Sequence, residues 1–421
     1  METVVIIGGG FAGLTLAKRL DPRKFDIKVV DRNNFHSFPP LFYQIASSGL
    51  SSPDILFPFR DEFRKRRNIS YHMGHIKMID IESRTVETSY ETLSYDRLVI
   101  AAGSANNYFG NDNLRKESFG IKTANEAMHT RDEIIDRLER ASICHDRSRR
   151  HELLSFLVVG GGPAGVEIAG AIGEMKRYVI PKEYPELSPD EMSVTLVEDS
   201  DTLLGPMGRK CGNIATKYLS ELMVDVRLNT RVEEYSGKYV TYADGRKEYA
   251  ETVIWTAGVC GENMPGIPDR CLGHGGRIKV DGTNLVEGME SVYAIGDICI
   301  MECDEKYPHG HPQVAPVAIQ QARNLAHNLN GNKPVSKFHY RDKGSMATIG
   351  KNKAVVKIGN KVLGGFPAWI IWLGVHLISI TGMRNRIFVF CNWIWNYFCN
   401  SSALRLLLRP AKYPLRKHWG D

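Results

Sequence analysis

Two glycine-rich segments of this chain have the residue types and spacing that can hold a pyrophosphate group. Each follows a short apolar run, has the pattern G-x-G-x-x-G and leads into a helix-forming stretch; the glycines are Gly8, Gly10 and Gly13 in the first and Gly160, Gly162 and Gly165 in the second. In such a motif the first glycine permits a tight turn, the second lets the backbone approach the phosphates, and the third lets helix pack against strand. Free N–H groups at the helix start attract the negative charge. Two copies therefore predict two bound dinucleotides.

A carboxylate stands at the end of the next apolar run in each copy. Asp31 follows the first motif by 18 residues and Glu198 follows the second by 33. The usual spacing is about 20, and a Pro-containing insertion at 182–189 lengthens the second one. A carboxylate in this place accepts hydrogen bonds from both hydroxyls of a ribose, and Glu198 would repel the 2′-phosphate of NADPH. The second copy is therefore predicted to bind NADH, while an N-cap or turn role is the alternative for Asp31.

The strands that must position these residues form a degenerate internal repeat. In each copy one strand precedes the glycines, one ends in the acid, and one runs into small residues, Ala101–Gly103 in the first copy and Ala257–Gly258 in the second. Residues 36–49 are predicted to form an ordered loop and a short helix, and a strand over 292–297 ends in Gly-Asp. Alternating strands and helices predict an α/β fold with two Rossmann-like dinucleotide-binding domains.

We expect three regions along the chain. They are a discontinuous first nucleotide-binding domain at 1–117 and 286–345, a second at 118–285, and a C-terminal membrane-associating region at 346–421.

The C-terminal region differs in charge from the rest of the chain. It has eleven Lys and Arg but one acid, whereas the whole protein carries a net charge of +6, and it holds five of the six Trp. Its uncharged run at 364–383 is long enough to span a bilayer but contains Pro367, His376 and several glycines. The pattern predicts an in-plane amphipathic anchor on an anionic membrane rather than a span, and it disfavours a solvated or nucleic-acid-binding tail. We expect four tryptophans at the depth of the headgroups: Trp369, Trp372, Trp393 and Trp395.

The cysteines give no sign of disulfide or metal chemistry. Eight Cys occur singly without a C-x-x-C pair, and no cluster of His, Cys and carboxylates suggests a metal site. A strand begins almost at Met1, so no signal peptide is expected. Reduced thiols in a cytosolic compartment are the resulting prediction.

Taken together, these segments resemble type II NADH:quinone oxidoreductases (NDH-2), within the flavoproteins that have two dinucleotide-binding domains. The resemblance covers nearly the whole chain, and its most specific part is the Gln-Gln helix (318–321) combined with the Trp-rich basic tail. The loop 40–44 and the strand 293–297 add to it. It implies a peripheral enzyme on the cytoplasmic face of a bacterial-type inner membrane. Hydride would pass from NADH to non-covalent FAD and two electrons to ubiquinone or menaquinone, without proton pumping. A homodimer is compatible with the sequence.

The resemblance also implies roles for individual residues. Those expected at FAD are Gly8, Gly10, Phe11, Ala12, Gly13, Asp31, Tyr43, Gln44, Ala102, Gly103, Asp297 and Ala318. Those expected at NADH are Gly160, Gly162, Pro163, Gly165, Glu198 and Gly258. The catalytic candidates are Glu167, Gln320 and Gln321, with Glu167 either relaying protons or only binding the nicotinamide.

This sequence departs from the family pattern at one position of the quinone motif. The family motif Ala-Gln-x-Ala-x-Gln-Gln has Pro316 here in place of its first Gln, so Gln320 or Gln313 would have to supply that polar contact. A sulfide:quinone oxidoreductase is the closest alternative enzyme, but it needs a reactive Cys pair and Cys260 has no evident partner. A non-catalytic flavin or NAD sensor that signals to a protein partner is a further alternative.

Overall fold

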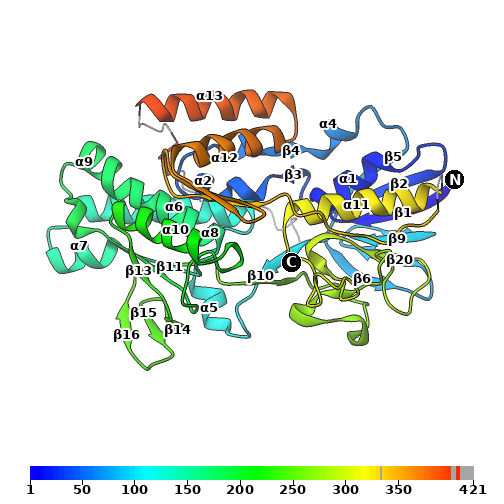
Figure 1. Ribbon diagram of the computed structural model, residues 1–421, viewed down its shortest axis with the longest axis horizontal. Helices are drawn as coiled ribbons and strands as arrows, with labels where there is room; N and C mark the ends of the chain where they lie inside the picture. Colours follow the sequence, from blue (N-terminus) through cyan, green and yellow to red (C-terminus); the bar gives the residue numbers. More distant parts are fainter. Residues whose placement is uncertain (332–333, 400–403, 408–421) are drawn as a thin grey trace.

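The computed structural model describes residues 1–331, 334–399 and 404–407. Figure 1 shows two α/β units side by side, with C-terminal elements along one side of them. In the first unit, five parallel strands lie in the order β20-β9-β1-β2-β5. Helices α1 and α11 pack together against this unit and run side by side in the figure. These elements are β1 (Glu2–Ile7), β2 (Phe25–Asp31), β5 (Ile69–Met73), β9 (Arg97–Ile100), β20 (Val292–Ala294), α1 (Phe11–Arg19) and α11 (Ala315–Asn330).

The second unit repeats the arrangement with a parallel sheet in the order β13-β12-β11-β17. Its strand β11 is buried at every position, as expected for a parallel strand covered on both faces. A small antiparallel sheet, β14-β15-β16, stands below it in Figure 1. These elements are β11 (Ser155–Val159), β12 (Ser193–Val197), β13 (Asp225–Arg227), β17 (Thr252–Trp255), β14 (Val232–Tyr235), β15 (Tyr239–Tyr242), β16 (Lys247–Tyr249), α6 (Ala124–Ser142), α8 (Pro163–Glu174) and α10 (Arg209–Glu221).

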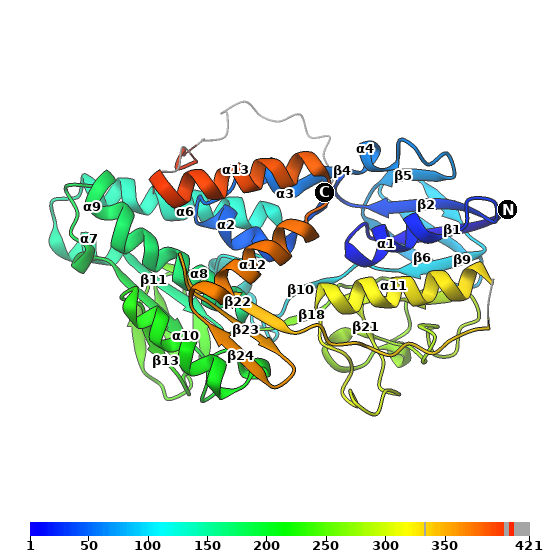
Figure 2. The same ribbon diagram turned by 45° about the horizontal axis from the view of Figure 1, so that its top comes forward.

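Two antiparallel strands, β10 (Ser104–Asn106) and β18 (Val259–Gly261), join the units where the chain crosses between them. They lie in the middle of the molecule in Figure 2. Each directly follows the small-residue segment of its own copy. The carboxyl ends of both parallel sheets therefore meet at this crossing, which is where open α/β sheets bind their ligands.

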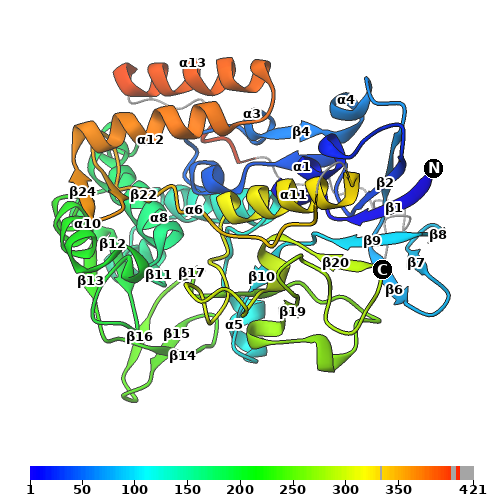
Figure 3. The same ribbon diagram turned by 45° about the vertical axis from the view of Figure 1, so that its right-hand side comes forward.

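The C-terminal layer consists of an antiparallel sheet and two helices. The sheet packs against α8 and α10, and α12 packs on the sheet and on α13. Figure 3 shows α12 and α13 one above the other along one side of the molecule. In the described part of the chain no helix is long and apolar enough to cross a membrane. These elements are β22 (Ser345–Thr348), β23 (Ala354–Ile358), β24 (Lys361–Gly364), α12 (Phe366–Ser379) and α13 (Met383–Cys399).

The predicted loop and short helix at 36–49 are present as β3, a 3-10 turn and α2, and α2 packs against α6 and α8. This segment therefore reaches from the first unit to the second. The remaining helices and longer strands are β3 (Phe35–Ser37), α2 (Phe42–Ala46), α3 (Ser52–Ile55), β4 (Leu56–Pro58), α4 (Phe59–Phe63), β6 (Ile76–Asp80), β7 (Thr85–Thr88), β8 (Thr92–Ser94), α5 (Asp112–Glu117), α7 (Arg147–Leu153) and α9 (Ile180–Glu183). The two-residue strands are β19 (Ile278–Lys279) and β21 (Cys299–Ile300).

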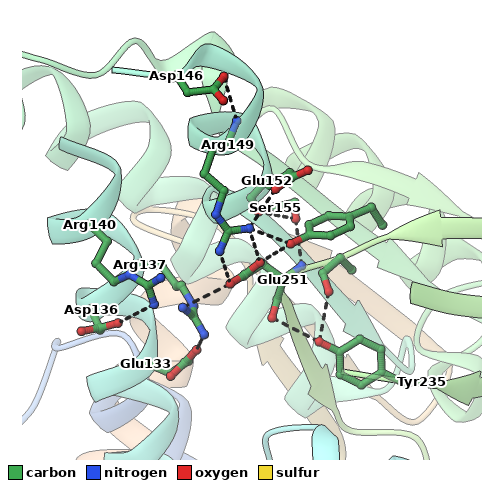
Figure 4. Close-up of polar contacts among 12 residues, drawn as sticks. Glu133, Asp136, Arg137, Arg140, Asp146, Arg149, Glu152, Ser155, Tyr235 and Glu251 are labelled. Carbon is green, nitrogen blue, oxygen red and sulfur yellow. Dashed lines mark hydrogen bonds and ion pairs between the residues drawn. The ribbon is translucent and has the colours of Figure 1, made fainter. Parts of the chain in front are cut away.

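Ion pairs hold the second unit together at the end opposite the crossing (Figure 4). The side chain of Glu251 is 9% exposed and pairs with Arg137 of α6 at 3.2 Å and with Arg149 of α7 at 3.1 Å. Arg149 also pairs with Glu152 at 2.8 Å. Arg137 and Arg149 both contact Glu251, so the cluster connects α6 and α7 to the loop before β17.

Candidate functional site

The first glycine loop has the geometry of a phosphate cradle. Gly8 has φ +97°, and a Cβ there would lie 2.4 Å from the Ala101 carbonyl oxygen. At Gly13 a Cβ would lie 1.9 Å from the Gly8 oxygen. Gly10, by contrast, has an ordinary φ of −68°, and apart from the adjoining backbone no atom of the described residues lies within 4 Å of a Cβ position there. Two glycines are therefore required by the fold, and the third faces open space at the start of α1.

The second glycine loop repeats this geometry. A Cβ at Gly160 (φ +106°) would lie 2.8 Å from the Ala257 nitrogen, and one at Gly165 would lie 1.8 Å from the Gly160 oxygen. Gly162, the N-cap of α8, has φ −70°, and a Cβ there would likewise meet no atom within 4 Å in the described part of the chain beyond the adjoining backbone. Pro163 occupies the first turn of α8, where its missing N–H costs no hydrogen bond. A pyrophosphate would fit the open space at either loop.

The two acids close their loops in the same way. Asp31 Oδ2 accepts a hydrogen bond from the Gly9 N–H at 2.7 Å, and Glu198 Oε2 accepts one from the Gly161 N–H at 2.5 Å. Burial raises the pKa of Asp31. Both carboxylates therefore lie beside the open spaces, as expected for groups that bind a ribose next to a pyrophosphate.

The strand end at Asp297 joins three distant segments. A Cβ at Gly296 (φ +81°) would lie 3.3 Å from the Cβ atoms of both Ala12 and Ala318, so α1 and α11 meet at this turn. Ser104 Oγ donates a 2.8 Å hydrogen bond to Asp297 Oδ2. Ala102 and Gly103 precede Ser104, and among the described residues other than its chain neighbours none has an atom within 4 Å of a Cβ position at Gly103 (φ +80°). These FAD candidates lie around the first cradle and the crossing strands.

Other candidates from the sequence lie behind the two loops. The Phe11 ring makes edge contacts with His36 and Phe38 at 5.5 and 5.6 Å between centroids, and His36 Nδ1 donates to the Gly9 oxygen at 2.9 Å. The segment at 36–38 therefore supports the first loop. Beside the second glycine loop, a Cβ on Gly258 (φ +86°) would lie 3.2 Å from the Phe109 ring.

The three glutamines expected near the quinone all have protein partners in this structure. Gln321 is 1% exposed, and its Oε1 accepts from the Gly296 N–H at 2.7 Å. Gln320 exchanges hydrogen bonds of 3.0 and 3.1 Å with the main chain of Arg341. Gln313 Nε2 donates to the Asp297 main-chain oxygen at 3.0 Å. In this structure the three amides thus hold the strand end and the chain that follows α11.

Glu167 lies in a buried polar cluster between α8 and the C-terminal layer. It is 8% exposed and accepts a 3.4 Å hydrogen bond from the Thr348 N–H. Burial raises the pKa of Glu167 to about 8, although Thr348 and the indole of Trp372 act in the opposite direction. By geometry, the buried Trp372 N–H makes no hydrogen bond in the described part of the chain. Glu167 is therefore mostly protonated at pH 7, and its carboxyl group lies on the side of α8 that packs against β22.

Side chains from α2, α12 and α13 complete this cluster. Gln44 donates to the Tyr43 hydroxyl at 2.7 Å and accepts from the Trp393 indole at 2.8 Å. Burial raises the pKa of Tyr43 well above its usual value. His376 stacks on Trp372 at 4.1 Å between ring centroids, and burial lowers its pKa to about 4. His376 is therefore neutral, which is compatible with the apolar run around it.

The expected depth of the tryptophans is wrong for Trp372, which is 1% exposed in the core. Trp369 and Trp393 are half-buried against that core, whereas Trp395 is 62% exposed. The spacing of Trp369, Trp372 and His376 places them on one face of a helix, and this is the signal that could have identified the inward face. The exposed face of α12 is apolar too, so composition alone could not distinguish the inward face of this helix from the outward one.

The described cysteines form no disulfide. Cys260 lies on β18 with its sulfur 3.6 Å from the main-chain oxygen of Asn106. The part of the chain that the structure describes holds no group of three His, Cys, Asp or Glu that could bind a metal.

Comparisons with known proteins agree with this arrangement. Residues 2–322 match the family model described as pyridine nucleotide-disulphide oxidoreductase, and residues 343–400 match the NDH2 C-terminal domain. The chain is 35% identical to the type II NADH:quinone oxidoreductase NdhA of Mycobacterium tuberculosis, over 93% of this chain and 86% of that protein.

Solved structures share the fold at lower identity. The NDH2 of Plasmodium falciparum in complex with NADH has a TM-score of 0.88 at 18% identity, covering 97% of this chain and all of that one. The sulfide:quinone oxidoreductase of Aquifex aeolicus has a TM-score of 0.72 at 18% identity, covering 95% and 96%. With a matching C-terminal domain and a relative at 35% identity, this chain belongs to the type II NADH:quinone oxidoreductases.

Proposed function

We propose that this protein is a flavoenzyme that oxidises NADH and reduces a membrane quinone. The proposal depends mainly on one observation, namely that two matching open cradles, at Gly10 and Gly162, face the same crossing between the parallel sheets. Family membership supplies the rest, since relatives in Mycobacterium tuberculosis and Staphylococcus aureus are named type II NADH:quinone oxidoreductases. No proton pumping is involved, and the two nucleotide-binding units divide the cofactor and the substrate between them.

FAD is assigned to the first cradle and NADH to the second. The backbone at Gly10 and the start of α1 would hold the FAD pyrophosphate, with Asp31 on the adenosine ribose and Asp297 on the ribityl chain. The backbone at Gly162 and the start of α8 would hold NADH, with Glu198 on its ribose. When bound, FAD supplies the hydride acceptor and the electron carrier. The residues named here supply position, which lowers the entropic part of the barrier.

Glu167 is our candidate proton donor for quinol formation. Overall, one hydride from NADH and one proton from solvent convert a quinone to a quinol. Glu167 is protonated at pH 7 and lies between the helix of the NADH cradle and the C-terminal layer. A general acid of this kind works best when its pKa is near the working pH. Its carboxyl group would therefore give up a proton to a quinone oxygen and be reprotonated from solvent.

The exposed face of α12 and α13 is our candidate membrane contact. It carries Ile378 (71% exposed), Trp395 (62%) and Phe398 (77%), with Arg384 beside the Phe388 ring. A large exposed apolar face with basic residues suits an anionic lipid surface. We infer a peripheral location on the cytoplasmic face of a bacterial-type inner membrane, with ubiquinone or menaquinone as the acceptor.

Anaerobic rapid mixing of the purified protein tests the proposal. We expect one FAD released per chain on denaturation, rapid bleaching of the bound flavin by NADH, and recovery of its absorbance when quinone is added. A protein that contains FAD but is not bleached by NADH would fit a sensor and contradict the enzyme proposal.

A further inference from the structure

Asp297, the carboxylate assigned to the ribityl chain, has a cationic neighbour, Lys122. Lys122 Nζ lies 3.9 Å from Asp297 Oδ2, on the oxygen that also accepts from Ser104. Within the described residues, no other carboxylate lies within 4.0 Å of this ammonium group. Lys122 belongs to the second unit and Asp297 to the first, so the pair crosses the boundary between them.

The main chain around Lys122 is firmly attached to the second unit. Phe119 exchanges backbone hydrogen bonds with β17, to the Val253 oxygen at 2.8 Å and from the Trp255 N–H at 2.7 Å. The Lys122 N–H donates to Glu126 Oε2 at 2.8 Å, and Thr123 forms the capping box of α6 with Glu126. The base of the side chain is therefore fixed, and only the ammonium group reaches the first unit.

This ion pair has little value for stability. The side chains of Lys122 and Asp297 are 28% and 21% exposed, and at 3.9 Å the pair is at the limit of direct contact. Partly exposed ion pairs of this kind contribute little to the free energy of unfolding. The positive charge of Lys122 matters more for the cofactor, because it faces Asp297, the carboxylate assigned to the ribityl chain of FAD. Two other charged groups lie near the Lys122–Asp297 pair. The carboxylate of Glu126 accepts hydrogen bonds from backbone N–H groups. Arg277 is buried and has no carboxylate within 4.0 Å among the described residues.

We propose that Lys122 is a positioning residue that raises the reduction potential of the bound FAD by compensating the charge of Asp297. This inference depends on the proposed function, since it takes FAD to occupy the first cradle. A hydride brings negative charge to the flavin, and an uncompensated carboxylate beside it would oppose that charge. With Lys122 in place the carboxylate is paired, so reduction by NADH is more favourable.

The test is the midpoint potential of the flavin in Lys122→Met, measured by spectroelectrochemistry on the FAD-loaded protein. We expect the equilibrium between oxidised and reduced flavin to shift about tenfold toward the oxidised form. For a two-electron couple this is a potential about 30 mV lower. Lys122→Arg keeps the charge and should keep the wild-type potential. Lys353→Met is the matched control, because it removes a lysine of similar exposure that pairs with Glu221 away from both cradles.

Two further readings make the outcome decisive. The thermal unfolding midpoint of the apoprotein should be the same in wild type and Lys122→Met, whereas a merely structural lysine would lower it. A wild-type potential in Lys122→Met would overturn the inference, whatever happens to FAD affinity. Flavin content of the wild-type protein is measured first, so that a failure of the proposed function is seen separately as a protein without FAD.

Discussion

The two nucleotide-binding units have almost the same loop but different surroundings. In both, the first and third glycines are fixed by close backbone contacts, the second faces open space, and an acid accepts a hydrogen bond from the residue between the first two glycines. The helices that follow differ. Helix α1 packs against α11, whereas α8 is buried at every residue from Gly165 to Gly173 under the C-terminal layer.

This difference shows what the internal repeat does and does not determine. The repeat supplies two equivalent cradles. The C-terminal layer packs on the helix of the second cradle through β22, and a protonated Glu167 lies between that helix and the layer. We therefore attribute nucleotide binding to the repeat and quinone chemistry to the third region.

The largest expected effect comes from filling the two open spaces separately. Gly10→Val should fold, because its φ of −68° suits valine and, in the part of the chain that the structure describes, only the adjoining backbone lies within 4 Å of the new Cβ. It should nevertheless be purified without FAD. Gly162→Val should contain FAD and fail to be bleached by NADH. Flavin absorbance and NADH titration measure both.

Gly13→Val serves as the control for strain. A Cβ there would lie 1.9 Å from a main-chain oxygen, so this variant should not fold. A Gly10→Val protein with a full complement of FAD would reverse or remove the assignment of the first cradle.

The second effect concerns Glu167, which has no counterpart in the first unit's helix. Glu167→Gln should slow flavin reoxidation by quinone about 100-fold, a typical value for loss of a general acid. In the wild type the reoxidation rate should fall as pH rises through about 8, since Glu167 then ionises. The variant should lack this pH dependence. Stopped-flow traces from pH 6 to 10 provide the measurement.

The same pKa predicts how stability changes with pH. A carboxyl group whose pKa is raised from 4.5 to about 8 on folding favours the folded state below pH 4.5 and loses that contribution as pH rises to about 8. The thermal midpoint of the wild type should fall across this range relative to Glu167→Gln. A constant difference between the two proteins would contradict a buried neutral Glu167.

The third effect is smaller and concerns the acid of the second cradle. The wild type should use NADH about 100-fold better than NADPH, which corresponds to about 2.7 kcal/mol. Glu198→Gln should narrow the ratio to about tenfold, because the amide no longer repels the 2′-phosphate. Values of kcat/KM for both nucleotides test this. Equal use of both by the wild type would remove the role given to Glu198.

The smallest effect concerns the membrane face. Ile378→Asp should weaken binding to anionic liposomes about tenfold, because full burial of an isoleucine is worth roughly 1.5–3 kcal/mol and a lipid surface buries the side chain only in part. Ile143→Asp is the control, since Ile143 is 76% exposed on the second unit. Point substitution is preferable to truncation before Asn385, because α13 packs on α3 and Trp393 bonds to Gln44. If Ile378→Asp and Ile143→Asp weakened liposome binding equally, the exposed face of α12 and α13 would not be the membrane contact.

Local patterns in the sequence were sufficient for the cradles but not for the cluster around Glu167. The glycine motif and its acid lie within one continuous stretch in each copy, from Gly8 to Asp31 and from Gly160 to Glu198, so they can be found without the fold. The hydrogen-bond partner of Glu167 is Thr348 of β22, which only long-range packing brings to α8. For Gln320 and Gln321 the pattern identified the helix, but their bonds to Arg341 and Gly296 depend on tertiary contacts.

Separating the two half-reactions tests the division between repeat and C-terminal layer most directly. The wild type, Gly162→Val and Glu167→Gln are each mixed anaerobically with NADH and, after chemical reduction, with quinone. We expect Gly162→Val to lose flavin reduction by NADH but keep flavin reoxidation by quinone. We expect Glu167→Gln to keep flavin reduction by NADH and to lose most of the reoxidation by quinone. If both variants lost the same half-reaction, the assignment of quinone chemistry to the layer over α8 would be contradicted.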